Sequence, residues 1–467
     1  MRKAGAGKAK IGLAVTTLMK DAFNDFSATR PEGEKRVRRI AKGLARFGTV
    51  VCPGLIEDEG QAAAARELFL REGVDVVVYA AISYAKSALA MRLFRGLAAP
   101  MIVWNTQYLR KAPEGAGFEA MWTDSGLAGI PGATHVLARE GTPFSMVTSH
   151  VDDEEGLARI GELVQAAQIA RGLASARVAT VGHVYEGMTD FMIDHEGLAE
   201  QIGPLTAPVD PGRVTKALGK VSEKDARGLA AKDRRRYGKV EATASELEAS
   251  ARLALAMERV LVTEEGADAA AILDQAWLDD PNIGIVASYG YAHLNRQGVP
   301  CICEMDVATA VAQLILERVM GPSMLCEFYD MDFEREAVLL CHDSNGNPAA
   351  AGNAKEVLLK PTSLYVGAKG RGVTVEFACP PGKVTMLALV DVGGWKLVAS
   401  EGESLETPAR PMGAPYMLFR HSRMKLGEFC RAWCESGVAH HMGGAYGTGA
   451  ERIATLGKMM GIETVVV

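Results

Sequence analysis

The sequence predicts an α/β protein with two doubly wound Rossmann-like domains followed by a C-terminal antiparallel β-barrel-like domain. Short apolar runs alternate with helical patterns over the first two thirds of the chain, and short alternating segments replace them after about Gly321. The chain has 467 residues, which is too long for one simple core. We therefore expect an N-terminal α/β domain at residues 1–174, a central α/β domain at 175–320 and a mostly β domain at 321–467.

The first domain is expected to alternate parallel strands with helices. Its short continuous apolar runs are typical of strands that are buried on both faces of a parallel sheet. The expected strands are Lys10–Val15, Thr49–Cys52, Val74–Ala80 and Pro100–Trp104, and the expected helices are Glu34–Phe47, Gln61–Glu72 and Lys86–Gly96. A helical crossover at Asp152–Ala174 leads into the second domain.

The second domain repeats this pattern, and the third departs from it. The expected elements of the second domain are the strand Arg177–Val181, the helix Ala244–Val260, the strands Ile283–Ala287 and Pro300–Glu304, and the helix Ala308–Arg318. In the third domain, turn residues separate segments that alternate with the period of antiparallel strands. These segments are Ala337–Leu340, Glu356–Leu359, Val373–Ala378, Lys383–Val392 and Trp395–Glu401, and a helix at Lys425–Ser436 and a strand at Glu463–Val467 follow.

Composition and charge argue against nucleic acid and membrane as binding partners. The net charge is −6 with both signs mixed along the chain, which argues against nucleic acid because phosphate binding needs a basic face. No stretch approaches 18 uninterrupted apolar residues, so no membrane span is expected. The basic start MRKAGAGKAK passes into a short apolar run at Ile11, which predicts a buried strand rather than a signal peptide. We therefore expect a cytoplasmic protein whose eight cysteines stay reduced.

Two carboxylates follow the apolar part of the segment PCICEMD, at Glu304 and Asp306. Acids at the carboxyl end of a parallel strand lie where α/β folds bind their ligands. The two side chains share a face in an extended chain, because side-chain direction repeats every second residue. The alternative is that they cap the helix expected at Ala308, a role that suits Asp306.

Three further segments carry ligand-type side chains. Glu327 follows an apolar run in SMLCEFYDMD, where a carboxylate is paired, protonated or metal-bound, although a solvent-facing strand Glu is an equal alternative. His342 ends the apolar strand of AVLLCHDSNGNP, where a hydrogen-bonded strand-end histidine is the alternative. His440 and His441 are adjacent in the glycine-rich segment GVAHHMGGAYGTG, and glycine allows the backbone to approach a ligand closely. This pair suits one metal ligand and one neighbour that contacts substrate.

Together, Glu304, Glu327, His342 and His441 predict a divalent-metal site. Mixed carboxylate and imidazole donors suit Mn²⁺ best, with Mg²⁺, Co²⁺ or Fe²⁺ as competitors. Such an ion polarises a carbonyl and hydroxyl pair as a Lewis acid, while a carboxylate beside it moves a proton between adjacent carbons.

The chain resembles the L-arabinose isomerase and L-fucose isomerase superfamily in a collinear series of motifs that covers nearly its whole length. The matching segments, each with the family motif that it resembles, are SYAK at Ser83–Lys86 (FSPAK), WNTQY at Trp104–Tyr108 (HTQF), CEMDVATA at Cys303–Ala310 (GEGDWKTA), CEFYDMDF at Cys326–Phe333 (MEDYTYHF), AVLLCH at Ala337–His342 (LVLGSH) and RAWCESGVAHH at Arg431–His441 (AWLxAGGAHH). The resemblance implies that Glu304 and Glu327 are metal ligands and acid/base groups. It also implies that His342 and His441, the second histidine of the adjacent pair, are metal ligands.

Further polar residues are expected around the sugar. The expected substrate contacts are Gln107, Glu186, Asp190 and His440, and Asp306 is expected to orient Glu304 or a metal-bound water. The central segment GHVYEGMTDF, at Gly182–Phe191, is more similar to fucose isomerase relatives than to the FGDNMR of arabinose isomerases. The resemblance therefore leaves the sugar open. It also implies a homotrimer or homohexamer.

The sequence thus predicts a metal-dependent aldose–ketose isomerase that acts on a pentose, a deoxyhexose or a related sugar through a cis-enediol intermediate. One glutamate removes a proton from C2 while the other manages the proton between the oxygens, and we expect Glu304 to be the base. A metal-dependent epimerase or lyase on a sugar derivative is the alternative, and the chain has no GxxxxGK[ST] loop for a phosphate. A non-catalytic sugar-binding paralogue is disfavoured, because all four ligand-type residues are present.

Overall fold

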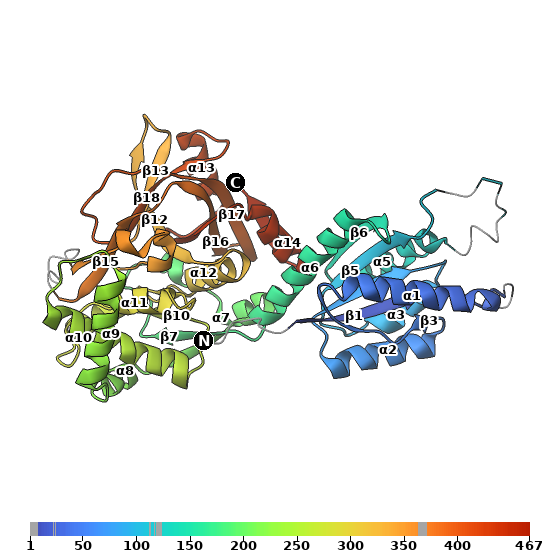
Figure 1. The fold of residues 1–467 in the computed structure, drawn as a ribbon, viewed down its shortest axis with the longest axis horizontal. Helices are drawn as coiled ribbons and strands as arrows, with labels where there is room; N and C mark the ends of the chain where they lie inside the picture. Colours follow the sequence, from blue (N-terminus) through green and yellow to red (C-terminus); the bar gives the residue numbers. More distant parts are fainter. Residues whose placement is uncertain are drawn as a thin grey trace. The chain divides into compact units, whose positions relative to one another are not determined.

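The computed structural model describes residues 8–21, 23, 25–111, 114–115, 117, 124–362 and 371–467 (Figure 1). These residues form an α/β protein, as predicted, and divide into two compact units. The N-terminal unit comprises the described residues up to Gly172 together with Thr455–Ile462, and the main unit comprises Leu173–Ala454 and Glu463–Val467. Residues 1–7, which hold most of the basic start, lie outside the described residues.

The N-terminal unit is built on a parallel sheet with the strand order β2-β1-β4-β5-β6, and the short β3 pairs with β1. Its strands are β1 (Ala9–Thr16), β2 (Gly48–Val51), β3 (Leu55–Ile56), β4 (Val76–Ala81), β5 (Met101–Gln107) and β6 (Phe144–His150). Its helices are α1 (Arg30–Leu44), α2 (Glu59–Glu72), α3 (Ser87–Phe94), α5 (Ile130–Arg139) and α6 (Glu154–Leu173), and the last residues of α14 (Ala450–Met460) join them.

Helices cover both faces of this sheet, because its strands are apolar on both sides. One core cluster joins Ile11 and Leu13 of β1 to α1 and α6. The other joins Val77 and Tyr79 of β4 to α2, α3 and α5. The parallel sheet that the continuous apolar runs predicted for this part of the chain is confirmed.

The main unit contains a second parallel sheet, with the strand order β11-β10-β7-β8. Its strands are β7 (Arg177–Val181), β8 (Leu205–Val209), β10 (Ala269–Ile272) and β11 (Cys301–Ile302). The helices of this part are α7 (His195–Gly197), α8 (Pro211–Leu218), α9 (Glu223–Arg236), α10 (Ala244–Met257), α11 (Ser288–Asn295) and α12 (Val307–Val319). The strand expected at Ile283–Ala287 is wrong: Gly284 takes φ +63° just after a turn, and the following residues form bends before α11 begins at Ser288.

The rest of the main unit is a mixed sheet of ten strands, in the order β20-β17-β16-β19-β12-β13-β18-β15-β14-β9. They are β9 (Lys239–Val240), β12 (Ser323–Asp332), β13 (Ala337–Cys341), β14 (Leu358–Pro361), β15 (Val373–Ala378), β16 (Gly382–Asp391), β17 (Trp395–Leu405), β18 (Pro415–His421), β19 (Met442–Tyr446) and β20 (Glu463–Val466). α13 (Leu426–Glu435) packs beside them. Because β17 also pairs with β18, the antiparallel ladder from β17 through β16, β19, β12, β13 and β18 returns to its first strand.

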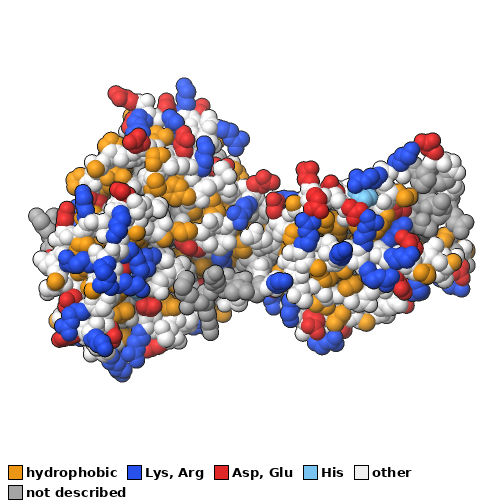
Figure 2. Space-filling view, viewed as in Figure 1, with side chains coloured by type: hydrophobic (Ala, Val, Ile, Leu, Met, Phe, Trp, Pro, Cys, Tyr) orange, Lys and Arg blue, Asp and Glu red, His pale blue; other side chains and the backbone are white. Residues whose placement is uncertain are grey.

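The surface carries both signs of charge. Figure 2 shows Lys and Arg side chains together with Asp and Glu side chains over the visible face of each unit, in keeping with the mixed charges of the sequence. Among the helices that the structure describes, none has both the length and the apolar character needed to cross a membrane.

Candidate active site

The parallel sheet of the main unit presents Glu304 at its carboxyl edge, where α/β folds place their ligands. β11 ends after two residues because Glu304 and the following Met305 both take φ +60°, a left-handed conformation that is rare for residues with a Cβ. The Met305 amide donates to the Ile272 carbonyl of β10, which helps to hold this backbone in place. Glu304 is only 7% exposed, so the unusual backbone directs a carboxylate into the protein interior.

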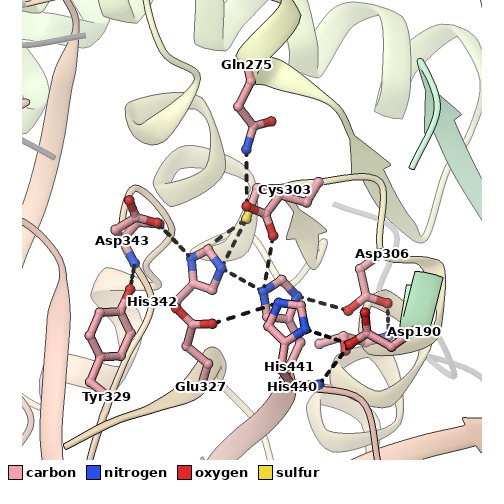
Figure 3. Close-up of polar contacts among 12 residues, drawn as sticks. Asp190, Gln275, Cys303, Asp306, Glu327, Tyr329, His342, Asp343, His440 and His441 are labelled. Atoms are coloured by element: carbon pink, nitrogen blue, oxygen red, sulfur yellow. Dashed lines mark hydrogen bonds and ion pairs between the residues drawn. The ribbon is translucent and has the colours of Figure 1, made fainter. Parts of the chain in front are cut away.

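The register of β12 brings the other three predicted ligands together. Glu327 pairs with the residue just before His342 on β13. Cys326 pairs with the residue just after His441 on β19. These ligand-type side chains therefore lie at one end of three adjacent strands, and Figure 3 shows them pointing toward a common centre.

The two buried imidazoles face each other through their Nε2 nitrogens. The Nε2 atoms of His342 and His441 lie 2.8 Å apart. The Nδ1–H of His342 donates to the Asp343 carbonyl at 2.6 Å, and the Nδ1–H of His441 donates to an Asp306 carboxylate oxygen at 3.1 Å. When a ring carries its only proton at Nδ1, it presents a lone pair at Nε2. Burial and the neighbouring His441 hold the pKa of His342 well below its usual range, which keeps that ring neutral.

This donor set fits a divalent cation. With both rings neutral, two lone pairs at 2.8 Å would repel each other, and a cation beside them would remove that repulsion. The Glu304 Oε2 atom is buried without a hydrogen-bond partner, 3.4 Å from His441 Nε2. Ligand atoms of Glu327, His342 and His441 lie within 4.8 Å of one another, as do those of Glu304, His440 and His441. Each imidazole also donates a hydrogen bond from its Nδ1–H to an oxygen, as the second nitrogen of a metal-binding histidine usually does.

The electrostatics of the site also favour a cation. Burial, followed by the charges of Asp343 and Glu327, raises the pKa of the Glu304 carboxyl to about 8. Gln275 is a stabilising neighbour, and its side-chain amide donates to Glu304 Oε1 at 3.2 Å. A cluster of carboxylates without a counter-charge is costly in a buried place, and a divalent ion would offset that cost.

Asp306 has two roles in the structure. Its Oδ1 accepts from the Thr309 amide at 3.0 Å and caps α12, as the alternative interpretation of this residue predicted. Its Oδ2 lies 3.1 Å from His441 Nδ1, so its polar contact within the site is with His441. The side chain thereby ties the start of a buried helix to a candidate metal ligand.

His440 lies at the outer side of the site and is held by Asp190. The Asp190 Oδ2 atom accepts from His440 Nδ1 at 2.6 Å and from its backbone amide at 3.2 Å. His440 Nε2 faces Glu327 Oε2 at 4.0 Å. Phe191 lies against the rings of both His440 and His441, with centroids 4.6 and 4.5 Å away. His440 is partly exposed, so it can meet a molecule that enters from solvent.

Gln107 and Glu186 remain predicted substrate contacts. Gln107 belongs to the N-terminal unit, where its side-chain amide donates to the Leu109 carbonyl at 2.7 Å. Glu186 is exposed on the segment that follows β7.

The structure adds residues to the site that the sequence analysis did not single out. They are Phe191, Gln275, Cys303, Tyr329 and Asp343. Cys303 and Asp343 are chain neighbours of predicted ligands, and that adjacency is a usable signal. Gln275 had no such signal, because it follows β10, whose four residues AAAI were not recognised as a strand.

Comparison with known proteins gives a consistent result. Residues 322–463 match the family model of the L-arabinose isomerase C-terminal domain. A sulfoquinovose isomerase of Alkalicoccus urumqiensis is 23% identical over 350 residues, which cover 72% of this chain and 74% of that protein. A second sulfoquinovose isomerase, from Priestia aryabhattai, is 21% identical over 402 residues, which cover 84% of this chain and 85% of that protein. An L-arabinose isomerase of Erwinia tasmaniensis is 24% identical over 385 residues, with 79% and 75% covered.

These matches support an isomerase enzyme. The matches support an enzyme of the arabinose isomerase type, and residues 322–463 are similar to the C-terminal domain of that family. Glu327, His342, His440 and His441 all lie within the matched domain, whereas Glu304 precedes it.

Proposed function

We propose that the chain is a metal-dependent aldose–ketose isomerase that acts through a cis-enediol intermediate. The observation that carries the proposal is the facing pair of Nε2 atoms of His342 and His441, 2.8 Å apart. Two glutamates, Glu304 and Glu327, lie beside that pair. This combination provides cation ligands and acid/base groups in one place, which is what an isomerisation between adjacent carbons needs.

Glu304, Glu327, His342 and His441 would hold the ion, for which Mn²⁺ is the leading candidate and Mg²⁺, Co²⁺ or Fe²⁺ are alternatives. When bound, the ion supplies Lewis-acid polarisation of neighbouring sugar oxygens. The chain keeps both imidazoles in the tautomer with a free Nε2, through the Asp343 carbonyl and the Asp306 carboxylate.

The two glutamates differ in environment, and the difference suggests their roles. Glu304 is buried and held by Gln275, and we propose that it removes the proton from C2 of the aldose and returns it to C1. Glu327 is more exposed, and we propose that it moves a proton between O1 and O2. His440, fixed by Asp190, is proposed to contact a sugar hydroxyl, and Gln107 and Glu186 are further proposed contacts.

The substrate is proposed to be a pentose, a deoxyhexose or a related sugar. The relatives are named for sulfoquinovose and L-arabinose. We propose that this chain acts on a sugar of the same general kind, in the cytoplasm, as a homotrimer or homohexamer. The three domains at 1–174, 175–320 and 321–467 are part of this proposal, and the closed strand ladder supports a barrel-like third domain.

The test is a panel of aldoses and ketoses assayed in D₂O with Mn²⁺. We expect deuterium at C1 or C2 of the product, loss of turnover after chelation, and recovery when Mn²⁺ is added. The double variant Glu304→Gln, Glu327→Gln should bind sugar but lose about 10³-fold or more in kcat. Glu356→Gln, an exposed carboxylate of the same unit, is the control. Full activity of the double variant would contradict the mechanism, and epimerised or cleaved product would show a different reaction.

A further inference from the structure

His440 is the outer member of the adjacent histidine pair, and two neighbours fix the orientation of its ring. Oδ2 of Asp190 accepts from His440 Nδ1 at 2.6 Å and from the His440 backbone amide at 3.2 Å (Figure 3). Phe191, which is 1% exposed, stacks on the ring with centroids 4.6 Å apart. The side chain of His440 is nevertheless 38% exposed. An oriented imidazole therefore lies where a molecule from solvent can reach it.

The two adjacent histidines differ in what their Nε2 atoms face. Nε2 of His441 lies 2.8 Å from Nε2 of His342, and the His441 side chain is 0% exposed. Nε2 of His440 lies 4.0 Å from Oε2 of Glu327, which is too far for a hydrogen bond. The inner imidazole is thus placed for an ion, and the outer one is placed for a proton of a bound molecule.

The pairing with Asp190 suits His440 to act as a general base. Because Nδ1–H donates to the carboxylate, a neutral ring carries its lone pair at Nε2. The same carboxylate stabilises the imidazolium that forms when Nε2 takes a proton, as in a Ser-His-Asp triad.

The space beside Nε2 of His440 is suited to a sugar hydroxyl. An oxygen about 2.8 Å from both Nε2 and Glu327 Oε2, which are 4.0 Å apart, would bond the two atoms at an angle of about 90°. A hydroxyl in this position lies next to Glu327, the group proposed to move a proton between O1 and O2. Nε2 of His440 therefore faces the reacting end of the sugar.

The proposed isomerisation needs a base at this end of the sugar before C2 reacts. An aldose in water is almost entirely a cyclic hemiacetal, whereas a cis-enediol forms only from the open aldehyde. We propose that His440 is the catalytic residue that opens the sugar ring, and that Asp190 is its positioning residue. This inference rests on the proposed function and deepens it, because it adds the step that supplies the open-chain sugar.

The ring-opening step needs no external reagent. Nε2 of His440 takes the proton of the anomeric O1–H group, and the electron pair of that O–H bond forms the C1=O1 double bond. The bond between C1 and the ring oxygen breaks, and its electron pair goes to the ring oxygen. The imidazolium then gives its proton to the ring oxygen, directly or through one water, so that His440 ends neutral.

The test follows the interconversion of α and β anomers by polarimetry, because this reaction needs ring opening and closing but no isomerisation. The probe is the fastest substrate among L-arabinose, L-fucose and the other aldoses of the panel, added as one pure anomer. The background is the full chain with Glu304→Gln and Mn²⁺, which lacks the proposed base for C2 but keeps Glu327 and both inner histidines. We expect this protein to interconvert the anomers at least about tenfold faster than buffer alone.

Three further substitutions in this background separate the roles. His440→Gln should return the rate to that of buffer, and Asp190→Asn should lower it about tenfold. His195→Gln is the control, because His195 is an exposed histidine of the same unit at the start of α7. An undiminished rate with His440→Gln, or no acceleration by a background protein that binds the sugar, would overturn the role of His440. An undiminished rate with Asp190→Asn would overturn the role of Asp190. A wild type that isomerises no aldose would instead overturn the proposed function.

Discussion

Oδ2 of Asp306 lies 3.1 Å from Nδ1 of His441, while Oδ1 of the same carboxylate caps α12 through the Thr309 amide. One side chain therefore fixes both the start of a buried helix and the tautomer of an imidazole. Because a neutral imidazole protonated at Nδ1 presents its lone pair at Nε2, this contact decides whether His441 can bind an ion.

Replacing Asp306 with Asn should separate these two roles. The amide oxygen still caps α12, but its NH₂ group then faces His441 Nδ1 and favours the tautomer that blocks Nε2. We expect Mn²⁺ affinity, measured by calorimetry, to fall about 10–100-fold while stability changes by less than about 1 kcal/mol. Asp210→Asn, which alters the cap of α8, is the matched control and should leave Mn²⁺ binding unchanged. Wild-type affinity in Asp306→Asn would show that the contact does not control the tautomer.

Asp190→Asn should weaken the positioning of His440. The short contact between Asp190 Oδ2 and His440 Nδ1 orients the ring toward Glu327, and the amide holds it less tightly. We expect kcat/KM to fall about tenfold, the equivalent of about 1.4 kcal/mol, with Mn²⁺ affinity nearly unchanged because His440 is not a proposed ligand. Steady-state kinetics and a metal titration on the same sample test both parts. A large loss of Mn²⁺ binding would instead make His440 a ligand.

Gly443→Ala should lower stability by disturbing the packing of β19, the strand that follows His441, against α12. A Cβ at Gly443 would lie 2.8 Å from Leu316 Cδ1 and 3.1 Å from Gln313 Cγ, so β19 would move away from α12. Overpacking of this kind costs about 1–3 kcal/mol, measurable by urea unfolding. Gly427→Ala is the control, because the same Cβ on α13 meets nothing within 4 Å. Equal stabilities of the two variants would rule out a tight packing role for Gly443.

Glu317 should make stability depend on pH. Burial raises the pKa of its carboxyl to about 7, although hydrogen bonds from Ser323 oppose the shift. A raised folded pKa in an acid means that the folded state binds more protons, so stability is highest below about pH 4.5 and falls as pH rises to about 7. Glu317→Gln should therefore be more stable than the wild type by about 1–3 kcal/mol at pH 8, and similar to it at pH 5. Urea unfolding at both values tests this, with the exposed Glu155→Gln as control. The same difference at both values would contradict the assignment.

Local sequence pattern was sufficient for much of the fold. The continuous apolar runs of Lys10–Val15 and Val74–Ala80 predicted buried parallel strands, because burial on both faces requires apolar side chains in both directions. The pattern failed where backbone conformation overrode it. Gly284 interrupts an apolar run that resembled a strand. The edge strand β8 was not predicted because it contains Pro208, and β19 was not predicted because it contains Gly443 and Gly444. In β19 the glycine at 443 gives room to α12 rather than to a ligand.

The sequence by itself determined which ligand-type side chains this protein has and where in the chain they stand, because carboxylates and imidazoles at the ends of apolar strands are visible locally. Only the tertiary structure decided which of them face one another. The register between β12 and its two neighbouring strands places Glu327 beside His342 and His441. The left-handed backbone at Glu304 and Met305 directs the Glu304 side chain into the protein interior. The tertiary structure also adds Cys303, which only its place beside Glu304 in the chain could have indicated, and Gln275, which no local pattern indicated. The physical reason is that side-chain chemistry and periodicity are local properties, whereas distances between segments depend on the packing of the whole unit.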